Sequence, residues 1–189
     1  MAEFEIRWSS AECAMAPIGD PLNLEEASGL SADELAELTS EAEAILGERP
    51  LVLARASSAG KGASGPAFAI VVEIERIFND SASLLAWGIF LNSLIRRISH
   101  KKGKDPVIED GKTLGALSMA VATKEGVVDD GDTDMTLIQT VPLTTTPGMG
   151  TNASDVWVSV FRRSDDNLRL VYITPAGRLV GAAVVPNLD

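Results

Sequence analysis

The chain has 189 residues, of which 46% are hydrophobic and 23% are charged. This apolar content is sufficient for one sizeable core, which excludes a chain disordered throughout, and the length fits one domain or two very small ones. The formal net charge of −11 repels phosphate backbones, so nucleic-acid binding is excluded as a property of the whole chain.

The first residues predict a strand and argue against a secretory signal. Residues 4–8, Phe-Glu-Ile-Arg-Trp, alternate apolar and charged side chains, as a half-buried strand does. Glu3 and Glu5 stand where a signal peptide needs basic residues. Cys13 is the one cysteine and has no partner for an internal disulfide, which is typical of a reducing compartment. We therefore expect a cytoplasmic protein.

A helix is expected after a loop that is rich in Pro and Gly and reaches about Leu30. Ser31 and Glu34 form the pattern of a capping box, and apolar residues follow at helical spacing. Gly47 and Pro50 should end this helix, because glycine favours the left-handed conformation and proline cannot continue a helix. A short strand is predicted next, at residues 51–54.

The glycine-rich segment 56–66, Ala-Ser-Ser-Ala-Gly-Lys-Gly-Ala-Ser-Gly-Pro, is the candidate anion site of the sequence. A nucleotide-binding P-loop is excluded, since Arg55 stands where that motif needs its first glycine and Gly62 where it needs Ser or Thr. A looser nest remains, in which Lys61 and the amides of Gly60, Gly62 and Gly65 hold an anion. The competing interpretation, which we favour, is a flexible connector.

Two helices are expected in the apolar stretch from Pro66 to Ser99. The first spans residues 67–78, with Pro66 in its first turn. The second runs from Ser81 to about Ser99 and is apolar nearly all round, which is typical of a helix buried at the centre of a domain. It is too short in uncharged residues to favour a membrane span. Its candidate contact residues for a partner are Trp87, Phe90, Arg96 and Arg97.

The only basic cluster of the sequence lies at the end of this second helix and comprises Arg96, Arg97, Lys101, Lys102 and Lys104. We interpret it as cations that favour the negative end of a helix. A patch for an anionic partner or a membrane surface is the alternative.

The last third of the chain predicts strands, and the segment before it is ambiguous. Residues 107–123 fit either a helix or a hairpin, and their alanine content favours a helix from Lys112. Strands are expected at residues 136–143, 156–163, 168–174 and 179–185, with turns at residues 164–167 and 174–177. The predicted fold is α+β: a helical first two-thirds with two short N-terminal strands, followed by an antiparallel β-meander of about four strands. One domain over residues 1–189 is expected, with a subdivision into 1–126 and 134–189 as the alternative.

The sequence contains no pattern that is typical of a catalytic or a metal site. The acidic run at residues 130–134 resembles the start of a calcium loop, but Met135 and Val141 occupy the positions that need Gly and Glu. One cysteine and one histidine, His100, cannot fill a zinc site. Glu73 and Glu75 are two residues apart, which points them in different directions on the predicted helix. We expect no catalytic residues, no metal and no cofactor.

The preferred function is a non-enzymatic interaction module, such as an inhibitor, an immunity-type protein or an accessory subunit, whose acidic surface binds a basic partner protein. The alternative is an enzyme or ligand sensor that binds an anion in the Gly60–Gly65 loop. A third hypothesis is peripheral membrane association through the Ser81–Ser99 helix. Homo-oligomerisation stays open.

Overall fold

The computed structural model describes residues 2–9, 16–58, 66–74, 81–127, 135–143 and 156–186. The chain divides into two compact units, Met1–Ile77 with Phe90–Asp110, and Phe78–Ile89 with Gly111–Asp189. The N-terminal part of helix α3 (Ser81–Lys102) belongs to the second unit, and its C-terminal part belongs to the first. That the chain forms one domain stays a prediction.

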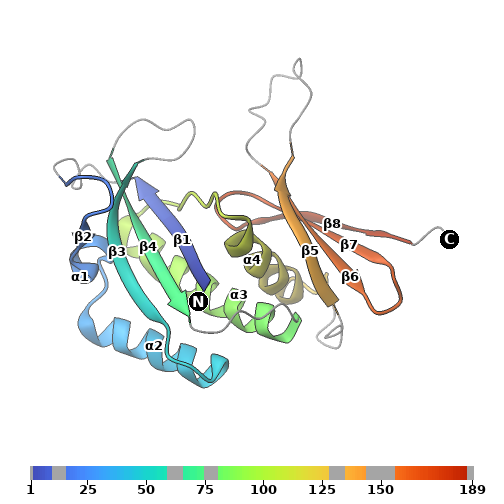
Figure 1. Ribbon diagram of the computed structural model, residues 1–189, viewed down its shortest axis with the longest axis horizontal. Helices are drawn as coiled ribbons and strands as arrows, with labels where there is room; N and C mark the ends of the chain where they lie inside the picture. The colour runs from blue at the N-terminus through green and yellow to red at the C-terminus, as the bar shows by residue number, and fades with distance from the viewer. Residues whose placement is uncertain are drawn as a thin grey trace, which may run out of the picture. The chain divides into compact units, whose positions relative to one another are not determined.

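The first unit is an antiparallel sheet with helices on one face (Figure 1). The buried side chains of its first strand alternate with exposed or half-buried ones, so Phe4, Ile6 and Trp8 face the core. Trp8 stacks on Phe68, with ring centroids 5.5 Å apart. The strand order is β1-β4-β3-β2, with β1 (Ala2–Ser9), β2 (Pro21–Leu22), β3 (Leu51–Ser58) and β4 (Pro66–Ile74), and the helices are α1 (Leu24–Ser28), α2 (Ala32–Leu46) and the end of α3.

Strand β4 replaces the helix that the sequence predicted at residues 67–78. It lies between β1 and β3, and nearly all its side chains are buried, including both Ile70 and the adjacent Val71. A strand buried on both faces has a continuous apolar run, which periodicity cannot distinguish from a buried helix. The β-branched residues of this run favour the strand. Pro66 is tolerated because it is the first residue of β4.

The capped helix is confirmed as α2. The Ser31 amide donates to Glu34 Oε2 at 2.8 Å, and the Glu34 amide donates to Ser31 Oγ at 3.2 Å. Gly47 follows the helix with a φ of 71°, in the left-handed region that glycine adopts without strain. The loop expected before Ser31 also contains β2 and the short helix α1, which Asn23 caps by accepting from two backbone amides.

The second unit is also an antiparallel sheet, and helix α4 contacts all four of its strands. Gly88 of α3 lies so close to α4 that an added Cβ would be 2.7 Å from Ala120 Cβ and would collide with the carbonyl of Ala116. The helix predicted from Lys112 is α4 (Gly111–Lys124), and the strands are β5 (Met135–Pro142), β6 (Trp157–Arg163), β7 (Leu168–Ile173) and β8 (Leu179–Val185), in the order β5-β6-β7-β8.

The predicted fold class is wrong. The described residues form two antiparallel four-stranded sheets plus four helices, and strands are about as common as helices. A helical first two-thirds is contradicted by the complete sheet β1–β4, whose strands alternate with helices along the chain. None of the described helices is long and apolar enough to cross a membrane.

Candidate functional site

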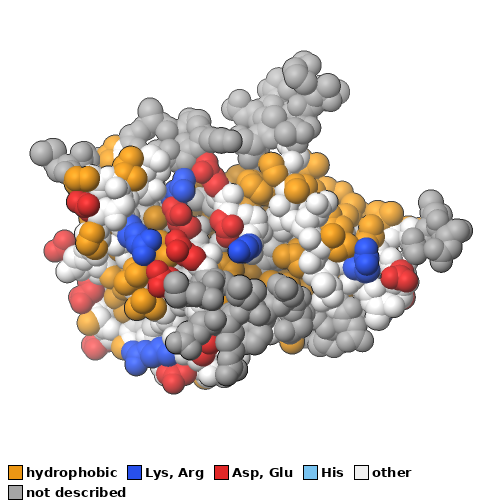
Figure 2. All heavy atoms as spheres, in the orientation of Figure 1, with side chains coloured by type: hydrophobic (Ala, Val, Ile, Leu, Met, Phe, Trp, Pro, Cys, Tyr) orange, Lys and Arg blue, Asp and Glu red, His pale blue; other side chains and the backbone are white. Residues whose placement is uncertain are grey.

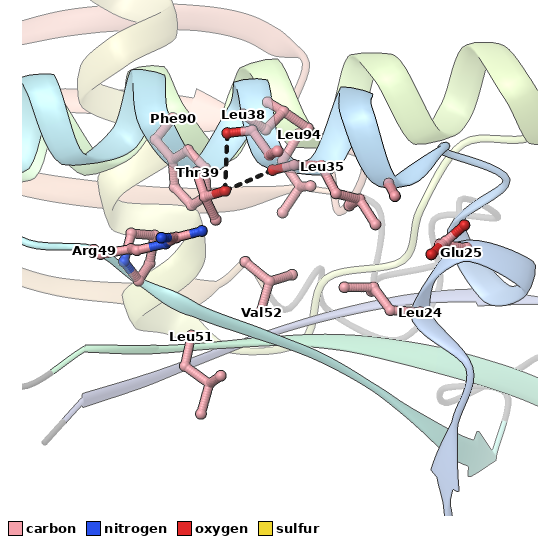
Figure 3. Close-up of a pocket in the computed structure, with 13 residues that line it drawn as sticks. Leu24, Glu25, Leu35, Leu38, Thr39, Arg49, Leu51, Val52, Phe90 and Leu94 are labelled. Carbon is pink, nitrogen blue, oxygen red and sulfur yellow. Dashed lines mark hydrogen bonds between the residues drawn. The ribbon is translucent and has the colours of Figure 1, made fainter.

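An apolar groove of about 370 Å³ lies in the first unit between α2 and the start of β3 (Figure 3). Val52 of β3 points into it, whereas Leu51 points away and is 53% exposed. The buried side chains of Phe90 and Leu94 from α3 also line it, next to Leu38 of α2. The α2 side of this α2–β3 groove consists of Ala32, Leu35, Ala36, Leu38 and Thr39.

Opposite charges stand at the two ends of the groove. Figure 3 shows the Arg49 side chain at one end and the Glu25 carboxylate at the other. Both residues are exposed, and within the described part of the chain neither side chain takes part in an ion pair. Both charges are therefore available to a ligand.

The one hydroxyl among the groove residues is already engaged. Thr39 Oγ1 donates to the carbonyl of Leu35 at 2.7 Å and lies 3.1 Å from that of Ala36. No histidine or cysteine lines the groove. The groove thus has the side chains for binding, with no nucleophile next to a base.

Beside this groove, the outer edge of β3 has no strand partner among the described residues, although helix α1 also contacts β3. Strand β2 pairs with β3 only at Arg55 and Ala54. No other described strand pairs with this edge, so the stretch from Leu51 to Leu53 has a strand neighbour only on the β4 side. An unpaired edge presents amide and carbonyl groups that a further strand can bond.

Helices α1 and α2 carry a strongly acidic surface. From Leu24 to Leu46, seven residues are Asp or Glu and none is Lys or Arg. Four of these carboxylates have no ion-pair partner among the described residues. We call them the acidic surface: Glu25, Glu26, Asp33 and Glu43. In Figure 2, acidic side chains appear along this border of the first unit.

The other three carboxylates of α2 form ion pairs with two of the five cations of the basic cluster. Arg97 Nη1 lies 3.1 Å from Glu37 Oε2, and its Nη2 lies 2.9 Å from Glu41 Oε1. Lys101 Nζ lies 3.0 Å from Glu34 Oε1. The Ser31 amide, and then Lys101, hold the pKa of the Glu34 carboxyl below its ordinary value of 4.5. These ion pairs of Arg97 and Lys101 therefore join α3 to α2.

Lys102 connects the end of α3 to α1 and to the sheet. Its ammonium donates to the carbonyl of Glu26 at 3.0 Å and lies 5.7 Å from the centroid of the Phe68 ring. Such a cation–π contact is favourable by about 0.5–1 kcal/mol when exposed. The interpretation of the basic cluster as an ordinary helix end thus missed these specific internal contacts.

The charges on the open face of the first sheet are paired with one another. Arg55 Nη2 lies 3.2 Å from Glu73 Oε1, and Arg7 contacts Glu5 at 2.6 Å and Glu109 at 3.0 Å. The hydrogen bond to Glu5 is the main cause that raises the pKa of the Arg7 guanidinium. Figure 2 shows acidic and basic side chains close together over this part of the first unit. The acidic surface differs from this face because its carboxylates are not neutralised.

Of the candidate residues that the sequence singled out, Phe90 is the one described residue that lines the α2–β3 groove. Gly60, Lys61, Gly62 and Gly65 are outside the described residues, as are Cys13 and the acidic run 130–134. Trp87 and Phe90 are both 2% exposed, and Phe90 lines the α2–β3 groove. Arg96 is exposed, and Arg97 is held by Glu37 and Glu41. Their roles in binding stay predictions.

Sequence reasoning missed the groove and its two charged ends. One signal was present: Ala32, Ala36 and Thr39 follow the helical spacing but leave small side chains on one stripe of α2. Small residues there leave space between the helix and β3. Nothing in the sequence places Arg49 and Glu25 at the two ends of one groove, because their positions depend on how α1, α2 and β3 pack.

Within the described ranges, no group of three His, Cys, Asp or Glu side chains could hold a metal ion. No protein-family model matches the sequence, and no curated protein or solved structure is significantly similar to it.

Proposed function

We propose that this chain is a protein-interaction module that binds a basic partner protein through its first unit. The observation that carries the proposal is an apolar groove bordered by carboxylates that have no ion-pair partner within the chain as described. An apolar centre with a polar rim is the usual anatomy of a protein interface. An inhibitor, an immunity-type protein or an accessory subunit would all use such a surface.

The acidic surface has two effects on such a partner. It accelerates encounter with a cationic protein, by roughly 10- to 10³-fold at low salt. It also gives specificity, since like charges oppose acidic competitors. Exposed charges are screened beyond about 8 Å at physiological salt, so association should slow as salt rises.

The proposal is tested by capturing partners from the native source with the full-length protein, purifying each one, and measuring Kd and association rate against salt. The test variant is Glu26→Gln with Glu43→Gln, which removes two charges of the acidic surface. The matched control is Glu125→Gln with Asp166→Asn, which removes two exposed charges from the second unit.

A cationic partner whose association slows several-fold in the test variant, and not in the control, supports the proposal. Equal binding by both variants, or a partner whose association does not depend on salt, contradicts it.

A further inference from the structure

We propose that the α2–β3 groove receives an extended segment of the partner as an additional strand on β3, running antiparallel to β3 and ending with a carboxylate at Arg49. This inference rests on the proposed function, because it names how the protein partner is held. It follows from four features of the first unit: the open edge, the direction of β2, the side-chain alternation and the two end charges.

The open edge presents a specific donor and acceptor. The Ala56 amide donates to the Asp20 carbonyl at 2.8 Å, and the Gly19 amide donates to the Ala56 carbonyl at 2.8 Å. Backbone groups of a strand alternate in direction, so the groups of Ala56, Ala54 and Val52 all point away from β4. Since β2 ends its pairing at Ala54, the amide and carbonyl of Val52 have no strand partner among the described residues.

The direction of the added strand follows from β2. Strand β2 is antiparallel to β3, and the chain leaves the sheet after Leu22 to enter α1. A segment that continues along this edge in the same direction passes Leu53, Val52 and Leu51 in turn. Its C-terminal end then reaches Arg49, and its N-terminal end lies toward Glu25 (Figure 3).

The alternation of side chains along a strand determines which residues of the bound segment must be apolar. Residues directly opposite each other in an antiparallel pair point to the same face. Val52 points into the groove, so the ligand residue opposite Val52 also points there, toward Leu35 and Leu38. The residue two positions later does the same, and the residue between them faces solvent. The segment therefore needs apolar side chains at alternate positions.

The end charges select the polar groups of the segment. Arg49 offers a guanidinium fork, which binds a carboxylate through two parallel hydrogen bonds. Glu25 at the other end favours a basic side chain. The expected ligand is thus basic at its N-terminal side, apolar at two alternate positions and acidic at its C-terminal end. A C-terminal carboxylate satisfies the last condition without a side chain.

A small apolar carboxylate would satisfy Arg49 and the groove equally well, and the volume is within the range of small-ligand sites. It would leave the amide and carbonyl of Val52 without partners. A main-chain segment satisfies both groups, so the open edge favours the peptide.

The experiment uses synthetic peptides, Lys-Φ-Thr-Φ with a free C-terminus, in which Lys lies opposite Leu53, the first position beyond β2, and Φ is Val, Leu, Ile or Phe in all combinations. Binding to the full-length protein is measured by fluorescence anisotropy, and the site is located by amide chemical shifts. We expect at least one peptide with a Kd below about 1 mM, with shifts at Val52 and Leu35. A C-terminal amide in place of the carboxylate should weaken it roughly 10-fold.

Matched changes separate main-chain pairing from simple apolar contact. N-methylation at the first Φ removes the amide that faces Val52 and should weaken binding at least roughly 10-fold, whereas N-methylation at the following Thr should change it little. In the protein, Arg49→Ala should abolish the preference for the free C-terminus, whereas Arg162→Ala, at an exposed arginine of β6, should not. Ala36→Phe should fill the groove, whereas Ala44→Phe, on the exposed part of α2, should bind as the unaltered protein does.

Four results would overturn the inference. Equal effects of the two N-methyl groups would exclude strand addition. Decanoate that binds with the affinity of the best peptide and the same dependence on Arg49 would identify a small-molecule site. A failure of every peptide, while a basic partner still binds through the acidic surface, would refute the strand and leave the proposed function intact. A failure of both would refute both.

Discussion

Gly88 is the residue whose replacement tests the packing of the second unit most directly. Its missing side chain lets α3 approach the backbone of α4 at Ala116, where a Cβ has no room. Alanine ordinarily improves a helix by about 1 kcal/mol over glycine. A collision with backbone outweighs this gain, so we expect Gly88→Ala to lower the free energy of unfolding by about 1–3 kcal/mol, measured by urea denaturation.

Gly115→Ala is the matched control for this prediction. A Cβ at Gly115 would lie 2.6 Å from Leu137 Cδ2, which is the far end of a flexible side chain and can move. Gly115→Ala should therefore cost less than Gly88→Ala. A larger cost at Gly115, or a stabilised Gly88→Ala protein, would show that the two helices do not pack as described.

Glu34 should make stability depend on pH. Its pKa is lowered by the hydrogen bond from the Ser31 amide, with a further contribution from Lys101. A lowered carboxyl pKa gives stability that is complete above the ordinary value of 4.5 and is lost as pH falls through the lower folded pKa. The stability difference between the unaltered protein and Glu34→Gln should therefore shrink below that pH. Carboxyl NMR titration measures the folded pKa directly.

Ser31→Ala separates the cap from the ion pair. It removes the hydroxyl that accepts from the Glu34 amide and should cost about 0.5–2 kcal/mol, as losses of N-caps do. The Ser31 amide and Lys101 remain, so the pKa of Glu34 should stay below 4.5. A Glu34 pKa at or above that value in the unaltered protein would contradict the prediction.

At the scale of elements, the sequence identified helix ends better than it identified buried strands. Ser31 and Gly47 are local signals, because a cap depends on residues within one turn, and α2 has these ends. Strand β4 depends on pairing with β1, which lies far away in the chain, and with β3 beyond the intervening loop, and neither pairing is visible in the apolar run itself. For the same reason β2, with two residues, could not be predicted from its own sequence.

Helix α4 is positioned on its sheet by a chain of three hydroxyls, of which Ser118 and Ser159 are buried and Thr140 is half-buried. Ser118 Oγ donates to the Leu114 carbonyl at 2.7 Å, so it accepts from Ser159 Oγ at 2.7 Å, and Ser159 in turn accepts from Thr140 Oγ1 at 3.0 Å. Ser159→Ala breaks two of these bonds in a buried site and should lower the free energy of unfolding by about 1–3 kcal/mol.

A double-mutant cycle checks this chain. Ser118→Ala with Ser159→Ala should cost clearly less than the sum of the two single changes, because both members of one hydrogen bond are lost together. Additive costs would mean that the two hydroxyls do not interact. Ser164→Ala, in the turn after β6, is the control and should change stability little.

At the scale of the whole molecule, the sequence shows the net charge directly but does not show where the groove lies. The excess of acid is visible in composition, but which carboxylates are neutralised depends on α3 meeting α2 at Arg97 and Lys101. The groove likewise needs α2, β3 and α3 together. Residues such as Trp87 and Phe90 were conspicuous in sequence because they are large and apolar, which is also why they are buried.

Because α3 is shared between the two units, we expect fragments of the second unit to fold only when they include the first part of α3. Residues 111–189 lack the first part of α3, so Ala116 and Ala120, both buried in the chain, would lose Gly88 as their neighbour. A fragment of residues 78–189 restores it. We expect thermal unfolding followed by circular dichroism to be cooperative for 78–189 and not for 111–189, and Gly88→Ala to weaken the longer fragment. If neither fragment unfolds cooperatively, the single-domain prediction holds instead, because the second unit would then need the first in order to fold.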